Sequence, residues 1–210
     1  MTPRFAIVGH PNKGKSSLVA TLAEDDGVPI APESGTTTRA VSYPMRVSGE
    51  VLYELVDTPG FQRARRALAW IRDAAETAAD RASAVTQFVE MHRDDVAMQA
   101  EVQLLGPIVQ GAGIIYVVDG AVPYGPEYEP EMEILRSTGR PSLAVINPIG
   151  GRDHVETWRD ALGQFFRIVR EVDVMSAPME RRLDLLRAFG ELDEGWRPGV
   201  ARAIDVLVGL

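Results

Sequence analysis

The amino-acid sequence predicts an α/β fold in three layers, with a mainly parallel six-stranded sheet between two layers of helices. Short apolar runs, typical of buried strands, alternate with segments of helical periodicity. A glycine-rich loop joins the first of these strands to the first helix. The 210 residues are enough for one α/β domain with a sizeable core. We therefore expect residues 1–210 to form a single domain, and the sequence leaves open whether it is the N-terminal part of a longer protein.

The composition is that of an ordinary globular protein, with 45% apolar and 25% charged residues. The formal net charge of −8 argues against a broad surface for direct nucleic-acid binding, which would need a basic face. The absence of cysteine excludes disulfides and thiolate chemistry. The N-terminus does not resemble a signal peptide, and no apolar run is long enough for a transmembrane segment. These features predict a cytoplasmic protein.

The first predicted strand, residues 4–8, leads into a loop that fits the phosphate-binding pattern Gly-x-x-x-x-Gly-Lys-Ser/Thr at every fixed position, from Gly9 to Ser16. Glycines let such a loop fold around a phosphate chain, and the N–H groups of the loop and of the next helix attract negative charge. We expect Lys15 to reach the β- and γ-phosphates and Ser16 to ligate Mg²⁺. The predicted nucleotide-binding residues of this loop are Asn12, Lys13, Gly14, Lys15, Ser16 and Ser17.

A polar loop and two strands follow the first helix. The loop, residues 31–39, contains a run of hydroxyls where a second Mg²⁺ ligand is expected, the alternative being a solvated threonine-rich loop. Residues 41–47 and 51–56 have the pattern of a hairpin. Asp57, at the end of the second strand, is expected to hold Mg²⁺ directly or through water. Gly60 allows a backbone N–H to approach the γ-phosphate, so we expect it to bind nucleotide and to act in catalysis with Lys15.

Three motifs together resemble the Era/EngA/TrmE group of bacterial P-loop GTPases: Gly-x-Pro-Asn-x-Gly-Lys-Ser, Gly-Thr-Thr-Arg and Asp-Thr-Pro-Gly. In the second motif this chain has three threonines, Thr36 to Thr38, where relatives usually have two. The resemblance implies a G domain that binds GTP and GDP with Mg²⁺, hydrolyses GTP slowly and changes the conformation of two switch segments. It also implies that Asn12 helps to bind K⁺. One of Thr36, Thr37 and Thr38 would be the Mg²⁺-binding and catalytic threonine of switch I, and counting back from Asp57 favours Thr38. Phe61 stands where Ras-like proteins carry a water-orienting Gln.

The segment from about residue 61 to residue 110 is much longer than the switch-II helix of simple GTPases. Its composition predicts two or three helices, with breaks near Ala82-Ser83 and His92-Arg93. We expect a helical insert that, with the switches, contacts a protein or ribonucleoprotein partner. Three arginines follow Gly60, and one of them is a candidate arginine finger, although a solvated helix face is the favoured interpretation. These are Arg63, Arg65 and Arg66.

The motif that reads guanine in this family departs from its pattern. A strand at 142–146 should end in Asn-Lys-x-Asp, but only Asn147 matches, and Gly150 stands at the position of the Asp. Asp153 lies three residues late and is a candidate replacement. Ser176 and Ala177 match the short Ser-Ala base-contact loop of the family. Guanine preference is therefore expected to depend partly on backbone groups.

The remaining pattern predicts a strand at 113–119, a helix at 129–138, a helix at 155–169, a last strand at 171–175 and closing helices at 179–189 and 199–208. The whole chain resembles a narrower group of bacterial GTPases that have a degenerate base motif, an enlarged switch-II insert and a C-terminal domain of unknown function.

Three functions remain open from the sequence. The first is a GTP-hydrolysing molecular switch. The second is an ATPase or base-unspecific NTPase, because the guanine motif is broken. The third is a nucleotide-dependent protein-binding scaffold with little hydrolysis, against which the intact Lys15 and Asp57 argue.

Overall fold

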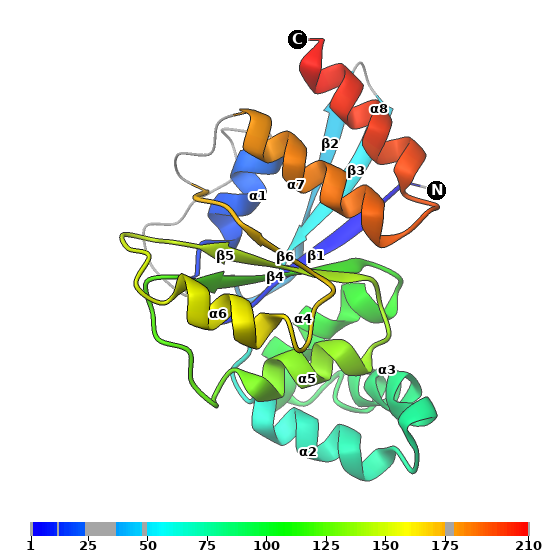
Figure 1. Ribbon diagram of the computed structural model, residues 1–210. Helices are drawn as coiled ribbons and strands as arrows, with labels where there is room; N and C mark the ends of the chain where they lie inside the picture. The colour runs from blue at the N-terminus through cyan, green and yellow to red at the C-terminus, as the bar shows by residue number, and fades with distance from the viewer. Residues whose placement is uncertain (1, 12, 24–36, 48–49, 175–178, 210) are drawn as a thin grey trace.

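A computed structural model describes residues 2–11, 13–23, 37–47, 50–174 and 179–209. It contains one six-stranded sheet in the order β2-β3-β1-β4-β5-β6 (Figure 1). β2 pairs antiparallel with β3 and the other pairs are parallel, which confirms the predicted mainly parallel sheet. The strands are β1 (Arg4–Val8), β2 (Val41–Val47), β3 (Glu50–Asp57), β4 (Gly113–Asp119), β5 (Ser142–Asn147) and β6 (Ile168–Glu171).

Helices cover both faces of the sheet and complete the three layers (Figure 1). The core on one face includes α1, α7 and α8, and the core on the other includes the helices from α2 to α6, of which α2 and α3 pack against α4 and α5. None of the described helices is long and apolar enough to cross a membrane. The helices are α1 (Lys15–Ala23), α2 (Ala64–Ala74), α3 (Arg81–Met91), α4 (Gln99–Val109), α5 (Glu129–Ser137), α6 (Val155–Leu162), α7 (Met179–Leu192) and α8 (Arg197–Val208).

The central strands explain the arrangement of the core. All seven residues of β4 are buried, because parallel strands covered on both faces have no polar side. Burial of each large aliphatic side chain there stabilises the fold by about 1.5–3 kcal/mol. Since β1 and β4 are neighbours and parallel, their carboxyl ends meet at one edge of the sheet. That edge carries the glycine-rich loop.

The chain between β3 and β4 forms three α-helices, within the predicted two or three. α3 ends at Met91, close to the predicted break at His92-Arg93. The earlier break lies at residues 75–80 and not at Ala82-Ser83. Its cause is local: Ala75 is extended, and the side chain of Asp80 accepts hydrogen bonds from the N–H and hydroxyl of Thr77, which starts the next helical segment.

The predictions for residues 155–175 need correction. The helix predicted at 155–169 ends at Leu162, and the strand predicted at 171–175 is instead β6 (Ile168–Glu171). The prediction was wrong because the aromatic residues have helical spacing although the helix does not continue. The chain turns after Gly163, and the N–H of Phe166 donates a hydrogen bond to the Leu162 carbonyl at 2.8 Å. This turn lets Ile168 pair with Leu143 of β5.

Candidate functional site

The glycine-rich loop lies at the carboxyl end of β1 and requires glycine at two described positions. Gly9 has φ +145°, and a Cβ there would lie 2.3 Å from the carbonyl oxygen of Val117. Gly14 has φ +82°, and a Cβ would lie 2.3 Å from Nδ2 of Asn147. Both φ angles disfavour any residue other than glycine. The loop is therefore packed directly against the ends of β4 and β5, with Asn12 outside the described residues.

Lys15, the first residue of α1, lies across its own loop. Its Nζ donates a hydrogen bond to the carbonyl oxygen of His10 at 3.0 Å, and the side chain is buried. An ammonium has three donors, so two remain for phosphate oxygens. Burial lowers the pKa of Lys15, and the nearby carboxylates of Asp57 and Glu131 oppose that effect. The site thus concentrates positive charge in a desolvated position, where it attracts phosphate strongly.

Asp57 accepts hydrogen bonds from two hydroxyls in different parts of the chain. Its Oδ2 accepts hydrogen bonds from Ser16 at 2.7 Å and from Thr37 at 3.2 Å. Its Oδ1 is buried without a hydrogen-bond partner among the described residues. Burial raises the pKa of Asp57, while Ser16, Lys15 and Thr37 lower it. Thr38, which the motif alignment favoured, is exposed, so Thr37 is the threonine that the structure brings to Asp57.

These residues fit a magnesium ion. Mg²⁺ prefers oxygen ligands, and it is held in P-loop NTPases by a loop hydroxyl and a strand carboxylate. The unpartnered Oδ1 of Asp57 supplies an available acceptor beside the hydroxyls of Ser16 and Thr37. An unpaired buried carboxylate oxygen is costly by itself, and a cation at this place would remove the cost.

The start of the predicted second switch rests on the glycine-rich loop. A Cβ on Gly60 would lie 2.6 Å from Cδ of Pro11, so only glycine lets the two segments approach this closely. The Thr58 hydroxyl donates to the Ile7 carbonyl at 2.7 Å and fixes the segment to β1. Phe61 is buried in the core cluster that also contains residues of α2 and α4. Its side chain is therefore not available to orient a water molecule.

Asn147, at the end of β5, connects three segments. Its Nδ2 donates to the Lys13 carbonyl at 3.5 Å, and its Oδ1 accepts the N–H of Val174 at 3.2 Å. The side chain is buried. Both ends of the amide are thus occupied in bracing the glycine-rich loop against the chain that follows β6. Asp153 is exposed, and Ser176 and Ala177 lie outside the described residues.

Two buried carboxylates near the loop were not predicted. Asp119 accepts the N–H groups of Ala121 at 2.9 Å and Ile149 at 3.3 Å, and it lies 3.7 Å from Nζ of Lys13. Its position at the end of a buried parallel strand was the signal that could have identified it. Glu131 of α5 accepts the Tyr116 hydroxyl at 2.8 Å and lies 2.9 Å from Nδ1 of His10. No local pattern marks Glu131, because its partners come from distant strands and loops.

The candidate arginine fingers are exposed. Arg63, Arg65 and Arg66 make no ion pair with a carboxylate in the described part of the chain. Nothing in the described structure directs one of them toward the glycine-rich loop.

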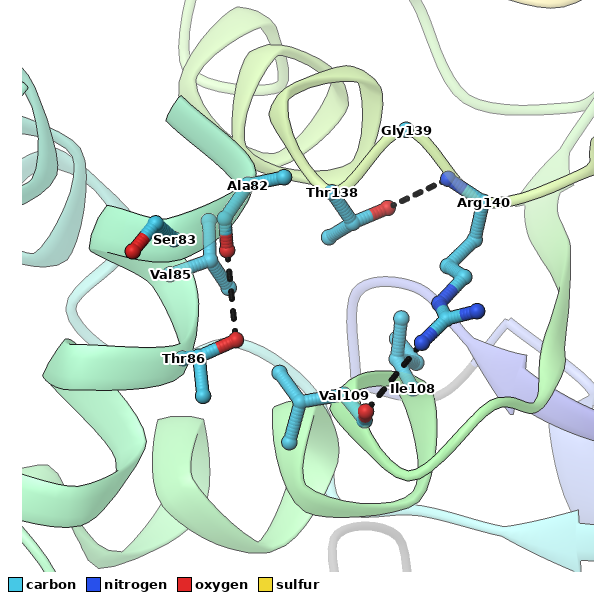
Figure 2. Close-up of a pocket in the computed structure, with 9 residues that line it drawn as sticks. All are labelled: Ala82, Ser83, Val85, Thr86, Ile108, Val109, Thr138, Gly139 and Arg140. Atoms are coloured by element: carbon cyan, nitrogen blue, oxygen red, sulfur yellow. Dashed lines mark hydrogen bonds between the residues drawn. The ribbon is translucent and has the colours of Figure 1, made fainter. Parts of the chain in front are cut away.

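A separate cavity of about 320 Å³ lies between α3, the end of α4 and the turn after α5 (Figure 2). Three of its polar groups already bond the protein. Thr86 donates to the Ala82 carbonyl, Arg140 donates to the Val109 carbonyl, and the Thr138 hydroxyl accepts from the Arg140 N–H. None of the lining residues belongs to the glycine-rich loop or to the residues described above as bonded to it, so this cavity is separate from the candidate site.

Comparison with known proteins agrees with this geometry. The family model described as a 50S ribosome-binding GTPase matches residues 4–148. GTPase Der of Mycoplasma pneumoniae is 47% identical over 60 residues, which are 29% of this chain and 13% of that protein. GTPase Der of Paraburkholderia phymatum is 26% identical over 160 residues, which are 76% of this chain and 30% of that protein. The chain therefore spans less than a third of the length of these curated relatives.

Solved structures share the fold. A variant of Aquifex aeolicus Era bound to GDP·AlF₄⁻ superposes with a TM-score of 0.60 at 18% identity, over 91% of this chain and 56% of that one. NFeoB of S. thermophilus bound to GDP·AlF₄⁻ and K⁺ superposes with a TM-score of 0.52 at 19% identity, over 88% of this chain and 60% of that one. Because the family model covers more than half of the chain, and the site has the matching loop and Asp57, the chain belongs to the 50S ribosome-binding GTPase family.

Proposed function

We propose that the protein binds GTP and GDP with Mg²⁺ and hydrolyses GTP slowly, as a molecular switch of the Era/EngA type. The observation that carries the proposal is the convergence of Ser16 and Thr37 on Asp57, beside the buried ammonium of Lys15. Phosphoryl transfer in such proteins is catalysed mainly by positioning and by electrostatic stabilisation. Membership of a GTPase family favours this activity over an ATPase, an unspecific NTPase or a scaffold.

Each group has a definite role in the proposed site. Lys15 neutralises charge on the β- and γ-phosphates, and the loop N–H groups of residues 12–17 cradle them. Ser16, Asp57 and a switch-I threonine hold Mg²⁺, which when bound neutralises charge between the β- and γ-oxygens. The hydrogen bond from Thr37 supports Thr37 in this role in place of Thr38. The N–H of Gly60 approaches the γ-phosphate, at a glycine already pressed against Pro11.

Guanine preference in this proposal is modest. Asn147 is committed to the loop and to Val174, and the exposed Asp153 has no described contact with that amide. Without a carboxylate aimed at the base, discrimination depends on backbone groups and on Ser176 and Ala177, and such sites discriminate weakly.

Two further assignments extend the proposal. Asn12 helps to bind K⁺, an assignment supported by the K⁺ in the S. thermophilus NFeoB structure. The partner is a protein or a ribonucleoprotein that contacts the switches and residues 61–110, in keeping with the ribosome-binding name of the family. A cytoplasmic location remains a prediction from the sequence.

The test is a titration with fluorescent GDP, GTP, ADP and ATP, followed by phosphate release from GTP and ATP in KCl and in NaCl at equal ionic strength. We expect tighter binding of the guanine nucleotides, slow release from GTP, and faster release in KCl. Arg187→Ala, on the exposed side of α7, is the control for nonspecific effects. Equal hydrolysis of ATP and GTP would support the unspecific NTPase, and binding without hydrolysis would support the scaffold.

A further inference from the structure

We propose that Glu101 and Gln103 of α4 are positioning residues for GTP hydrolysis, because they fasten both switch segments to one helix. Here the first switch segment means residues 37–40 and the second means residues 60–63. This inference deepens the proposed function, since it names how the helices between β3 and β4 act on the same site.

The side chain of Glu101 binds the backbone of the second switch segment. Its Oε1 accepts the N–H of Gln62 at 2.8 Å and also the N–H of Arg63. The side chain is fully buried, and its Oε2 has no hydrogen-bond partner among the described residues. Burying a carboxylate costs free energy, but a charged acceptor bonds N–H groups about twice as strongly as a neutral one. An ionised side chain at this place therefore fixes the backbone better than an amide or hydroxyl would.

The backbone that Glu101 holds is the part that follows Gly60. Gly60 is pressed against Pro11 of the glycine-rich loop on one side, and Phe61 is packed in the core. The two N–H groups bonded by Glu101 belong to the next two residues. Since Gly60 is the proposed γ-phosphate contact, a small displacement of Gln62 and Arg63 would move the N–H of Gly60 away from its productive position.

Gln103 attaches the first switch segment to the same helix. Its Oε1 accepts the N–H of Ala40 at 3.2 Å, and Ala40 is three residues beyond Thr37, which bonds Asp57. Residues two positions apart on a helix point about 200° apart. Glu101 and Gln103 therefore reach from different sides of α4 to the two segments, so that a shift of α4 would change both attachments together.

α4 also connects this pair of contacts to the rest of the helices between β3 and β4. It packs against α3 and runs into β4, so it cannot shift independently of the helices in front of it. A partner bound to those helices would thus act on hydrolysis through Glu101 and Gln103, without touching the nucleotide.

The test compares Glu101→Asp, Glu101→Gln and Gln103→Ala with the matched controls Glu90→Asp and Gln87→Ala, both on exposed positions of α3. Asp keeps the charge but is one methylene shorter, so it cannot reach both N–H groups. We expect single-turnover GTP hydrolysis to be about tenfold slower in Glu101→Asp and about threefold slower in Gln103→Ala, with GDP affinity within about threefold of the parent. Glu101→Gln keeps the length and an acceptor oxygen but loses the charge, so its rate should lie between those of Glu101→Asp and the parent.

Hydrogen exchange supplies a readout that a general loss of stability would not mimic. In nucleotide-free protein, Glu101→Asp should speed exchange at the amides of Gln62 and Arg63, and Gln103→Ala should speed exchange at Ala40 and also at those two amides. Parent-like rates of hydrolysis and exchange in both variants would overturn the inference. If the parent itself releases no phosphate from GTP, the proposed function fails, while the exchange measurements still decide whether α4 couples the two segments.

Discussion

The two halves of the candidate site are built differently. On the phosphate side, glycines at positive φ, a buried lysine and a carboxylate bonded by two hydroxyls converge at the ends of β1 and β3. On the base side, Asn147 is occupied in bracing and Asp153 is exposed. Phosphate binding depends largely on backbone geometry and charge, whereas discrimination between bases needs a particular side chain in a particular direction. The phosphate half of such a site can therefore persist when the base half has changed.

The largest effect should come from the phosphate side. Lys15→Ala removes the charge that meets the β- and γ-phosphates, and Asp57→Ala removes the proposed Mg²⁺ ligand. Charge-assisted contacts contribute about 1.5–3 kcal/mol each, so nucleotide affinity should fall about tenfold to a hundredfold. The loss should be equal for GDP and ADP, because the phosphates are common to both. Unchanged binding of fluorescent GDP in both variants would remove the phosphate-site assignment.

Asn147→Ala should show that this residue belongs to the phosphate side. The variant leaves the Lys13 carbonyl and the Val174 N–H without their partner, so the free energy of unfolding should fall by about 1–3 kcal/mol. Affinity for GDP and ADP should fall together, with their ratio unchanged. Urea unfolding and nucleotide titration measure the two effects, and Gln164→Ala, at an exposed position, is the control. A selective loss of GDP affinity would instead place Asn147 on the base.

Asp57→Asn should stabilise the protein when Mg²⁺ and nucleotide are absent. Burial raises the pKa of Asp57 in the folded chain, so the ionised carboxylate destabilises the fold. This penalty is absent below the unfolded pKa near 3.8 and grows as the pH rises through the folded pKa. In EDTA the variant should therefore have a higher Tm than the parent at pH 7, and the difference should shrink as the pH falls toward 4.

The control for that measurement is Asp153→Asn, because Asp153 is exposed. It should change Tm little at any pH. A variant Asp57→Asn that melts below the parent at pH 7 would mean that the hydrogen bonds from Ser16 and Thr37 outweigh the cost of burying the charge.

The smallest effect is expected at Asp153. An exposed carboxylate contributes little to a contact, so Asp153→Ala should change the ratio of GDP to ADP affinity by less than about threefold. The parent ratio should itself be below about a thousandfold. A large ratio that collapses in the variant would establish Asp153 as the displaced base-recognition residue, and a large ratio that persists would assign discrimination to backbone groups or to Ser176 and Ala177.

The residues of the phosphate half were assigned from local pattern because each lies in a short motif next to a predicted strand. The loop from Gly9 to Ser16 and the end of β3 at Asp57 were both identified from spacing and strand context. The choice between Thr37 and Thr38 was not, since neighbouring threonines are alike in sequence and only the path of the chain decides which reaches Asp57. Glu101 and Glu131 were missed because they lie within helices, where no motif or strand end marks them, and their partners lie 39 and 121 residues away.

The fold was predictable to a similar degree. The strand at 4–8 and the strand at 113–119 have the predicted bounds, because apolar runs that end just before Gly9 and Gly120 leave little choice. The aromatic residues between 155 and 169 were assigned to one helix because their spacing suits a helix and also suits a turn onto the same core. The pairing of β6 with β5 stabilises the structure in which the chain turns, instead of one continuous helix.

The double attachment of Asn147 has a consequence for how this kind of sequence can drift. Residues 148 and 150–153 can change with little effect on the glycine-rich loop, since among residues 147–153 the described side-chain contacts to that loop come from the Asn147 amide and from Ile149, which lies near Gly14. Asn147 itself cannot be exchanged as freely, because no other side chain of its size offers an amide donor toward Lys13 and an acceptor toward Val174. A lineage that relaxes its choice of base would thus be expected to retain the first residue of the motif and lose the rest. The asparagine would then be retained because it connects two loops, and its presence alone would not indicate which base is bound.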